Sequence, residues 1–206
     1  MNNGKNDLTE GSIGRKLISF FLPIAAGTLF QQLYNAADAI VVGKFVGTIA
    51  LAAVGGSAAH ITNLLIGFFV ALSGGSTVVI AQLFGAKDEE SIQKATGTAI
   101  AFCIISGIVL TIVGFAFTPV FLRVLQSPPD TIAESTTYLR IVFLGVTAQL
   151  LYNMEAGMLQ AVGDSKSPFI YLFICCMFNI FLDLLLVAIF KMGVAGVAWA
   201  TFLCQG

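Results

Sequence analysis

The sequence predicts an all-α integral membrane protein, a polytopic bundle of long apolar helices. Hydrophobic residues make up 57% of its 206 positions and charged residues only 10%. The mean hydropathy is +0.93, whereas a soluble domain must cover its surface with polar and charged side chains. Several charge-free stretches also exceed the roughly 20 residues that a helix needs to cross a bilayer. We therefore expect the chain to lie within a membrane.

The expected spans follow from these stretches. Residues 1–16 form a polar lead-in, which we expect in the cytoplasm, and residues 17–206 form the membrane domain. The spans are expected at 17–42, 58–83, 92–119, 132–162, 167–190 and 193–206. The last stretch is too short to cross a bilayer at about 1.5 Å per residue. This stretch is either a partial insertion into the membrane or a helix at which the chain is cut, and we favour the cut.

The distribution of basic residues sets the expected orientation. With the N-terminus inside, the inner side holds Lys5, Arg15, Lys16, Lys87, Lys94 and Lys166, and the outer side holds Lys44, Arg123, Arg140 and Lys191. Basic residues favour the cytoplasmic side of a membrane protein. The prediction is a multi-pass protein of the cell membrane with its N-terminus in the cytoplasm.

The composition argues against several classes of function. Ten basic and eleven acidic residues nearly balance, and no basic patch interleaved with aromatic residues indicates nucleic-acid binding. The sequence contains no HExxH, no Ser-His constellation and no nucleotide-binding glycine motif, so neither an enzyme nor an ATP-driven pump is expected. The single histidine, His60, is expected to pack or to form a hydrogen bond, with proton relay as the alternative.

The cysteines and two glycine pairs of the chain have structural interpretations. The cysteines Cys103, Cys175, Cys176 and Cys204 lack CxxC spacing, so we expect small buried side chains and neither a metal nor a redox site. Glycine pairs at 55–56 and 74–75 are expected to allow close contact between helices.

Polar side chains in four predicted spans fall at one depth. Odd-numbered spans run outward and even-numbered ones return, which places Asp38, Tyr138, Asp183 and Thr201 in the outer half of the membrane. A buried carboxylate costs at least about 2.5–3.5 kcal/mol on insertion scales. Two such residues at matched depth therefore indicate a functional site rather than an accident of composition.

Helical spacing extends the set. Three groups each share a helix face, namely Gln31, Asn35 and Asp38, then Asn179 and Asp183, and then Thr201 and Gln205. Polar stripes of this kind avoid lipid and point into a bundle or a wet cavity. In the fourth span, Gln149, Asn153 and Glu155 are further candidates for cavity lining. Glu155 either lines a cytoplasmic substrate path or reaches the interface near Lys166, and both readings stay open.

Two carboxylates in a weakly polar cavity resist carrying two negative charges. The pair can therefore hold a proton, or share Na⁺ with neutral oxygens from Asn179, Tyr138 and Thr201. Releasing the ion would change the charge of the cavity and favour a rearrangement of the helices. The alternative is that Asp38 and Asp183 are interhelical glue, bonded to Asn, Gln or Tyr. The matched depth favours ion coupling.

Several stretches, in order along the chain, resemble the multidrug and toxic compound extrusion (MATE) family. They are DLTEGSIGRKLISFFLPI, QQLYNAADAIVVGKFVG, LAAVGG, AQLFGAKD, LQAVGDSKSP, NIFLD and GVAGVAWAT. The resemblance covers nearly the whole chain. It implies a transporter of twelve helices in two six-helix lobes, which exchanges Na⁺ or H⁺ for organic cations or amphipathic drugs. Asp38, Asn179 and Asp183 match the cation site of the family's N-lobe, and Tyr138 and Thr201 match polar positions near it.

This resemblance implies one lobe, with its sixth helix truncated and the C-terminal lobe missing. The missing lobe belongs either to the same longer chain or to a second half that pairs with this one. The expected partners are an organic cation or amphipathic compound and the lipid bilayer, with no cofactor beyond the coupling ion. Two alternatives remain, a lipid-linked sugar flippase of related architecture and an isolated lobe acting as a scaffold or inactive remnant. A flippase for pyrophosphate-linked lipids would favour clustered Arg or Lys in its cavity.

Overall fold

The computed structural model describes residues 13–205, in which every regular element is a helix. The elements are α1 (Ile13–Phe45), α2 (Thr48–Ala53), α3 (Ala59–Gly85), α4 (Glu89–Val124), α5 (Ile132–Ala161), α6 (Lys166–Asp183) and α7 (Val194–Gln205), with wider π-helical turns η1 (Val54–Ala58) and η2 (Leu184–Ile189). Most of the predicted lead-in lies outside the described residues, and α1 begins before the expected position 17.

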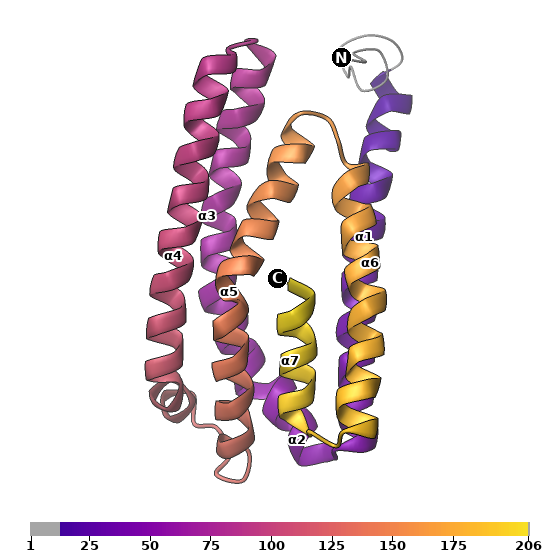
Figure 1. Ribbon diagram of the computed structural model, residues 1–206, viewed down its shortest axis with the longest axis vertical. Helices are drawn as coiled ribbons and strands as arrows, with labels where there is room; N and C mark the ends of the chain where they lie inside the picture. The colour runs from indigo at the N-terminus through magenta and orange to yellow at the C-terminus, as the bar shows by residue number, and fades with distance from the viewer. Residues whose placement is uncertain (1–12, 206) are drawn as a thin grey trace.

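The long helices alternate in direction and form two groups. In Figure 1, α3 and α4 lie beside α5, while α1 and α6 lie side by side on the other side of the molecule. The short helix α7 enters between the two groups from the lower end and stops near the middle. The N-terminal end and the α3–α4 and α5–α6 connections share the upper end, as the alternation of spans requires.

Four stretches among residues 13–205 are long and apolar enough to cross a membrane. They are Leu17–Phe45, Thr48–Gly85, Glu89–Val124 and Lys166–Ile189. The second begins about ten residues earlier than the sequence predicted, because α2 and η1 continue into α3. The predicted fourth span is present as α5, but its composition is more polar than that of the other four.

The polarity of α5 follows from its central position. Its buried residues Leu139, Phe143, Leu150 and Met154 form a core with side chains of α3 and α4. The helix also packs against α2, α6 and α7. A helix surrounded by protein has no need to be apolar on every face, so α5 can carry polar residues at membrane depth.

The close contacts between helices lie at other glycines than the sequence suggested. A Cβ atom added at Gly55, Gly56, Gly74 or Gly75 would meet nothing within 4 Å, so these pairs do not form the predicted close contact with any of the described helices. The faces that carry them are turned away from the other described helices. At Gly107 of α4, by contrast, an added Cβ would lie 2.7 Å from the Cα of Thr147 on α5. Nearby, Thr111 Oγ1 donates a hydrogen bond of 2.8 Å to the Phe143 carbonyl.

The apolar stretch Thr48–Gly85 is interrupted at Gly56, whose backbone angles are not helical. An unpaired backbone group inside a membrane costs on the order of several kcal/mol. Two side chains lie within hydrogen-bond distance of backbone carbonyl groups at this break. The His60 Nδ1 atom lies 3.1 Å from the Gly56 carbonyl oxygen. From α5, Ser135 Oγ donates a hydrogen bond of 3.0 Å to the Ala53 carbonyl. His60 therefore has the hydrogen-bonding role expected for it.

Aspartates fix the starts of two helices at the upper end. Asp88 Oδ1 accepts a hydrogen bond of 3.1 Å from the N–H of Ser91 at the start of α4, and hydrogen bonds from Ser91 lower the pKa of Asp88. Before α6, Asp164 accepts bonds from the N–H groups of Lys166 and Ser167 and from Ser167 Oγ. Partial burial opposes the ionisation of Asp164, but these bonds lower its pKa. Both aspartates satisfy free N–H groups of a helix start.

The α4–α5 contact at Gly107 predicts a sharp difference between two glycines of the same helix. Changing Gly107→Ala should destabilise the protein by roughly 1–3 kcal/mol, because the methyl group overpacks the contact with Thr147. Changing Gly97→Ala is the matched control. An added Cβ meets nothing within 4 Å there, so the better helix propensity of alanine should leave stability unchanged or raise it by up to about 1 kcal/mol. Thermal unfolding in detergent measures both, and equal stabilities would contradict the contact.

Candidate functional site

Two carboxyl groups meet between α1 and α6. Asp38 lies in the last third of α1, and Asp183 is the last residue of α6 before the backbone widens into η2. The two side chains interact directly with each other. Asp183 is fully buried, and Asn179, one turn earlier on the same helix, is 2% exposed. The pair is therefore held inside the bundle and away from the lipid-facing surface.

Two tyrosines stand around the carboxyl pair. Tyr34, one turn before Asp38 on α1, and Tyr138 of α5 both lie close enough to the two acids to interact with them. The ring of Tyr138 also packs against a second apolar cluster at the lower end, which includes Val42, Val187 and Val197. Tyr138 thus connects the acids to the packing of α1, η2 and α7.

The polar atoms of this cluster have few protein partners. Asp38 Oδ1, both carboxyl oxygens of Asp183 and both amide atoms of Asn179 are buried without a hydrogen bond of ordinary geometry to another described residue. The Cys204 thiol of α7 lies against the Asn179 amide. Buried polar atoms are usually paired, and each exception in a native structure calls for an explanation. If these residues only held helices together, their polar atoms would be paired in hydrogen bonds with neighbouring side chains. A site for an exchangeable ion would instead leave these atoms free to bind the ion.

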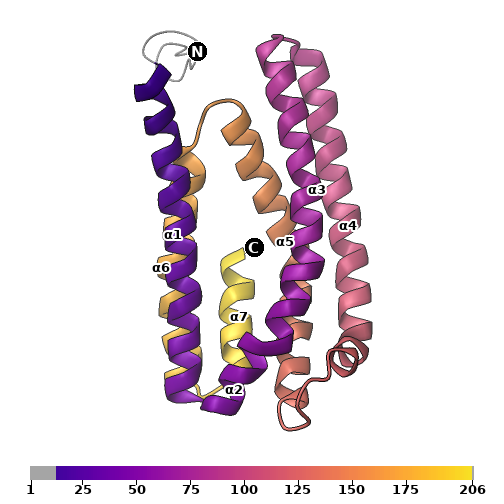
Figure 2. The ribbon, with the colours of Figure 1, turned by 180° about the vertical axis from the view of Figure 1, so that it is seen from behind.

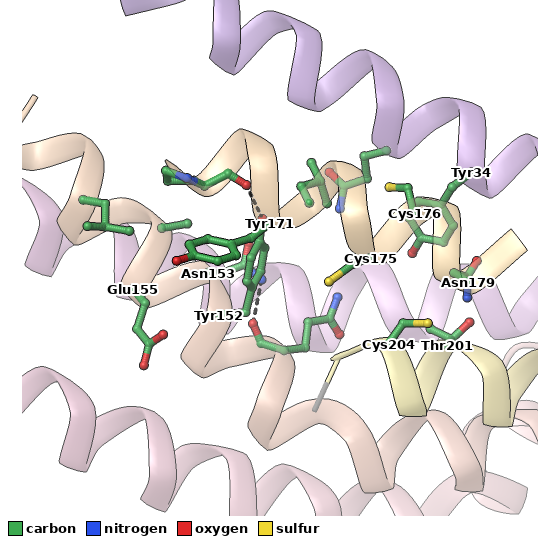
Figure 3. Close-up of a pocket in the computed structure, with 16 residues that line it drawn as sticks. Tyr34, Tyr152, Asn153, Glu155, Tyr171, Cys175, Cys176, Asn179, Thr201 and Cys204 are labelled. Carbon is green, nitrogen blue, oxygen red and sulfur yellow. Dashed lines mark hydrogen bonds between the residues drawn. The ribbon is translucent and has the colours of Figure 1, made fainter. Parts of the chain in front are cut away.

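A cavity of about 530 Å³ adjoins the cluster. Figure 3 shows Asn179, Thr201 and Cys204 at one end of the group of lining residues and Glu155 at the other. The lining comprises Gln31, Tyr34, Gln149, Tyr152, Asn153, Glu155, Ala156, Leu159, Pro168, Tyr171, Leu172, Cys175, Cys176, Asn179, Thr201 and Cys204. The carboxyl groups of Asp38 and Asp183 are not part of this wall. Tyr34 and Asn179 belong both to the cavity and to the surroundings of the acids.

Some of the residues that were expected to line a cavity do so, and others do not. Gln31, Gln149, Asn153, Glu155 and Thr201 all lie in its wall. Asn35 does not, which corrects the expectation from spacing. It is exposed on α1 and donates a hydrogen bond of 3.2 Å to Gln32 Oε1. The side chain of Gln205 lies outside the described residues.

Helix geometry explains the position of Asn35. With about 3.6 residues per turn, Gln31, Tyr34 and Asp38 fall on one narrow sector of α1, and Asn35 lies at the edge of that sector. Asp38 lies between Gln31 and Tyr34 on this face, and Tyr34 lies on the side opposite to Asn35. The spacing of four residues between Tyr34 and Asp38 was a signal that the sequence contained, but a tyrosine in an apolar run resembles ordinary packing.

The cysteines were the other residues whose position the sequence did not indicate. Cys103 is buried in the core between α4 and α5, as expected. Cys175, Cys176 and Cys204 lie in the cavity wall. Cys176 is buried as expected, whereas Cys175 and Cys204 are partly exposed, so the prediction of a buried side chain is wrong for these two. Their spacing from Asn179 and Thr201, three or four residues, places them on the polar faces of α6 and α7.

The donor atoms of the cluster fit a proton or a hard monovalent cation. Two carboxylates, an amide oxygen and hydroxyl groups are oxygen donors, which suit Na⁺ better than a soft metal. Among residues 13–205, no group of three or more His, Cys, Asp or Glu is placed to hold a metal ion. A bound Na⁺ would therefore rely on the two carboxylates and on neutral oxygens.

Comparison with known proteins agrees with this architecture. The MatE family model matches residues 23–185. The chain is 33% identical over 197 residues to the probable multidrug resistance protein YoeA of Bacillus subtilis (strain 168), which covers 94% of this chain and 42% of YoeA. Two solved structures each align with a TM-score of 0.90 and 25% identity over 100% of this chain and 45% of theirs. One is a MOP superfamily transporter from Pyrococcus furiosus, and the other is a multidrug resistance MATE family transporter in an outward-facing conformation.

These relatives are membrane transporters and not enzymes, which defines the class of this protein. The chain belongs to the MatE family, the multidrug and toxic compound extrusion family that its motifs resemble. It spans less than half the length of the relatives it matches, and its coverage corresponds to one lobe.

The unpaired atoms of the acid cluster lead to a prediction about stability. Changing Asp183→Asn keeps the shape of the side chain and removes its charge. If Asp183 is kept for ion binding, thermal stability should stay unchanged or rise by up to about 1–3 kcal/mol, because a buried charge without full compensation destabilises the fold. If the residue holds helices together, stability should fall by a similar amount. Thermal unfolding of the two proteins in detergent decides between these outcomes.

The cavity also predicts which cysteines react. A membrane-permeant maleimide should label Cys175 and Cys204 in the native protein, because both thiols are partly exposed in the cavity wall. Cys103 is 0% exposed and should be labelled only after denaturation. Mass spectrometry of peptides after timed labelling measures all of these sites in one chain. Labelling of Cys103 at the same rate as Cys204 would contradict the described packing.

Proposed function

We propose that the chain is the N-terminal lobe of a secondary antiporter that exports organic cations or amphipathic drugs in exchange for Na⁺ or H⁺. The coupling ion binds in this lobe, at Asp38, Asn179 and Asp183, with Tyr138 and Thr201 nearby. The observation that carries the proposal is the buried carboxyl pair, whose oxygens and neighbouring amide lack ordinary protein hydrogen bonds. Such atoms are available to an ion that enters and leaves.

The connection between ion and substrate follows from the cavity. Tyr34 lies close enough to the acids to interact with them, and Asn179 lies one turn before Asp183 on α6; both residues also line the cavity. Binding or release of the ion changes the charge next to these residues. The same change acts on Tyr138, which packs against η2 and α7. An ion can therefore bias both the cavity wall and the packing of the helices that surround it.

The lining of the cavity supports the substrate class. It carries three tyrosines and one acid, and it has no Lys, Arg or His among the described residues. Such a surface suits an aromatic or cationic compound. It offers nothing to bind a pyrophosphate group, which argues against the flippase alternative.

A second lobe completes the transporter. The exposed Gln32–Asn35 pair on α1 and the exposed His60 and Asn63 on α3 are polar residues within apolar helices. Polar groups of this kind avoid lipid and face protein or a wet cavity. Figure 2 shows α1, in front of α6, and α3, in front of α4, both on the face of the lobe that is turned toward the viewer. This is the side on which the second lobe would lie, in a cell membrane with the N-terminus in the cytoplasm.

Loss of the charge on Asp183 tests the coupling. Asp183→Asn should abolish efflux of a fluorescent organic cation from energised vesicles, or reduce it at least about tenfold, because the pair can no longer exchange its ion. Asp130→Asn is the matched control, since Asp130 is exposed in the connection between α4 and α5. Efflux equal to that of the parent in Asp183→Asn would rule out coupling through this residue.

The same vesicles identify the ion. Uptake is measured against a Na⁺ gradient without a pH gradient, and then against a pH gradient without Na⁺. The gradient that drives transport in the parent protein, and fails to do so in Asp183→Asn, belongs to the coupling ion. Transport that needs neither gradient would contradict antiport.

A further inference from the structure

The cavity wall has a definite order along its length. Figure 3 places Glu155 at one end, Tyr152 and Tyr171 between the two ends, and Asn179 and Thr201 at the far end. The far end adjoins the acid pair. Glu155 lies near the end of α5 and is exposed, so it stands on the side of the cavity away from the ion site.

Glu155 is the only charged side chain in this wall. The other lining residues are tyrosines, amides, cysteines, a threonine and apolar residues. No described Lys or Arg forms an ion pair with Glu155, and the ion pair found in the described chain is Lys94–Glu90 on α4. The carboxylate is therefore available to a cation that enters the cavity.

The neighbouring tyrosines supply a surface for an aromatic body. Tyr152 is oriented by a bond of 3.4 Å from its hydroxyl to the Pro168 carbonyl at the start of α6. Tyr171, on the adjacent face of α6, is 59% exposed and lines the same cavity. Aromatic faces attract cations and stack on flat rings. A cavity wall that carries one carboxylate and two such rings fits a flat aromatic compound with one positive charge.

We propose that Glu155, with Tyr152 and Tyr171, forms a cation-selective subsite at the end of the cavity opposite the ion site, and that Glu155 determines the preference for positively charged over neutral aromatic compounds. This inference rests on the proposed function, because it assumes that the cavity receives the transported compound. It assigns charge selection to a residue that takes no part in binding the coupling ion. The acid pair and Glu155 then act on different cations.

A pair of probes with the same shape tests the subsite. N-methylacridinium carries a fixed positive charge, and acridine at pH 8 is neutral. Binding of each is measured by fluorescence on the full protein in lipid nanodiscs at low ionic strength. Glu155→Gln should weaken binding of N-methylacridinium by about two- to fivefold, the effect of a partly exposed charge pair, and leave binding of acridine unchanged.

Three controls separate charge from shape. Glu155→Asp should retain most of the preference for the cation, and added salt should reduce the preference in the parent protein. Glu89→Gln removes an exposed acid from the start of α4, at the same end of the lobe, and should change neither probe. Unchanged acridine binding shows that the cavity of the Glu155→Gln protein is intact.

The inference is overturned if Glu155→Gln weakens both probes equally, if it weakens neither, or if the parent binds the two probes with the same affinity. Because the assay measures binding without gradients, it is independent of transport. Selective binding through Glu155 in a protein that exports nothing would refute the proposed antiport and leave the subsite in place. Gradient-driven export by a protein in which Glu155→Gln does not change the charge preference would refute the subsite and leave the proposed antiport in place.

Discussion

The contact between the carboxyl groups of Asp38 and Asp183 constrains the rest of this lobe. Two acids inside a membrane protein are stable only if they share a proton, bind a cation or find enough hydrogen-bond donors. The described surroundings offer few donors, since the oxygens of Asp183 and the amide of Asn179 lack ordinary hydrogen bonds. The remaining ways to stabilise the pair both involve an exchangeable ion. A pair of acids that is unfavourable without an ion and stable with one is suited to coupling ion binding to a change in the packing of the helices.

The fold holds this pair beside the smaller of two apolar clusters. One apolar core joins α3, α4 and α5 around Phe143 and Leu150, and the close approach at Gly107 fixes α4 against α5. A second and smaller cluster joins α1, α2, η2 and α7 near the acids. Tyr138 extends from the firmly packed α5 into this smaller cluster. The backbone turns wide directly after Asp183, and π-helical turns of this kind are frequent at functional sites.

The sequence predicted the class of fold and most of the helices, because apolar stretches of about 20 residues have few other uses. It also predicted that Asp38 and Asp183 lie at the same level of the bundle and that Asn179 and Asp183 share a face of one helix. It did not predict Tyr34 or Cys204, since their side chains resemble packing residues until the neighbouring helices are known. The glycines that make close helix contacts could not be predicted for the same reason. The sequence does not distinguish Gly56 from Gly107, and only the position of α5 makes Gly107 a close contact. The choice between two roles for Glu155 likewise required the cavity.

The central claim is that Asp38 and Asp183 exchange an ion, and infrared difference spectroscopy tests it most directly. The protonated carboxyl group has a carbonyl band that differs from the bands of a carboxylate. The parent protein should show such a band, and it should disappear when Na⁺ is added or when the pH is raised, with no such change in Asp38→Asn or Asp183→Asn. A spectrum in this region that does not respond to Na⁺ or to pH in the parent protein would mean that the two acids are fixed structural partners, and the account would be wrong.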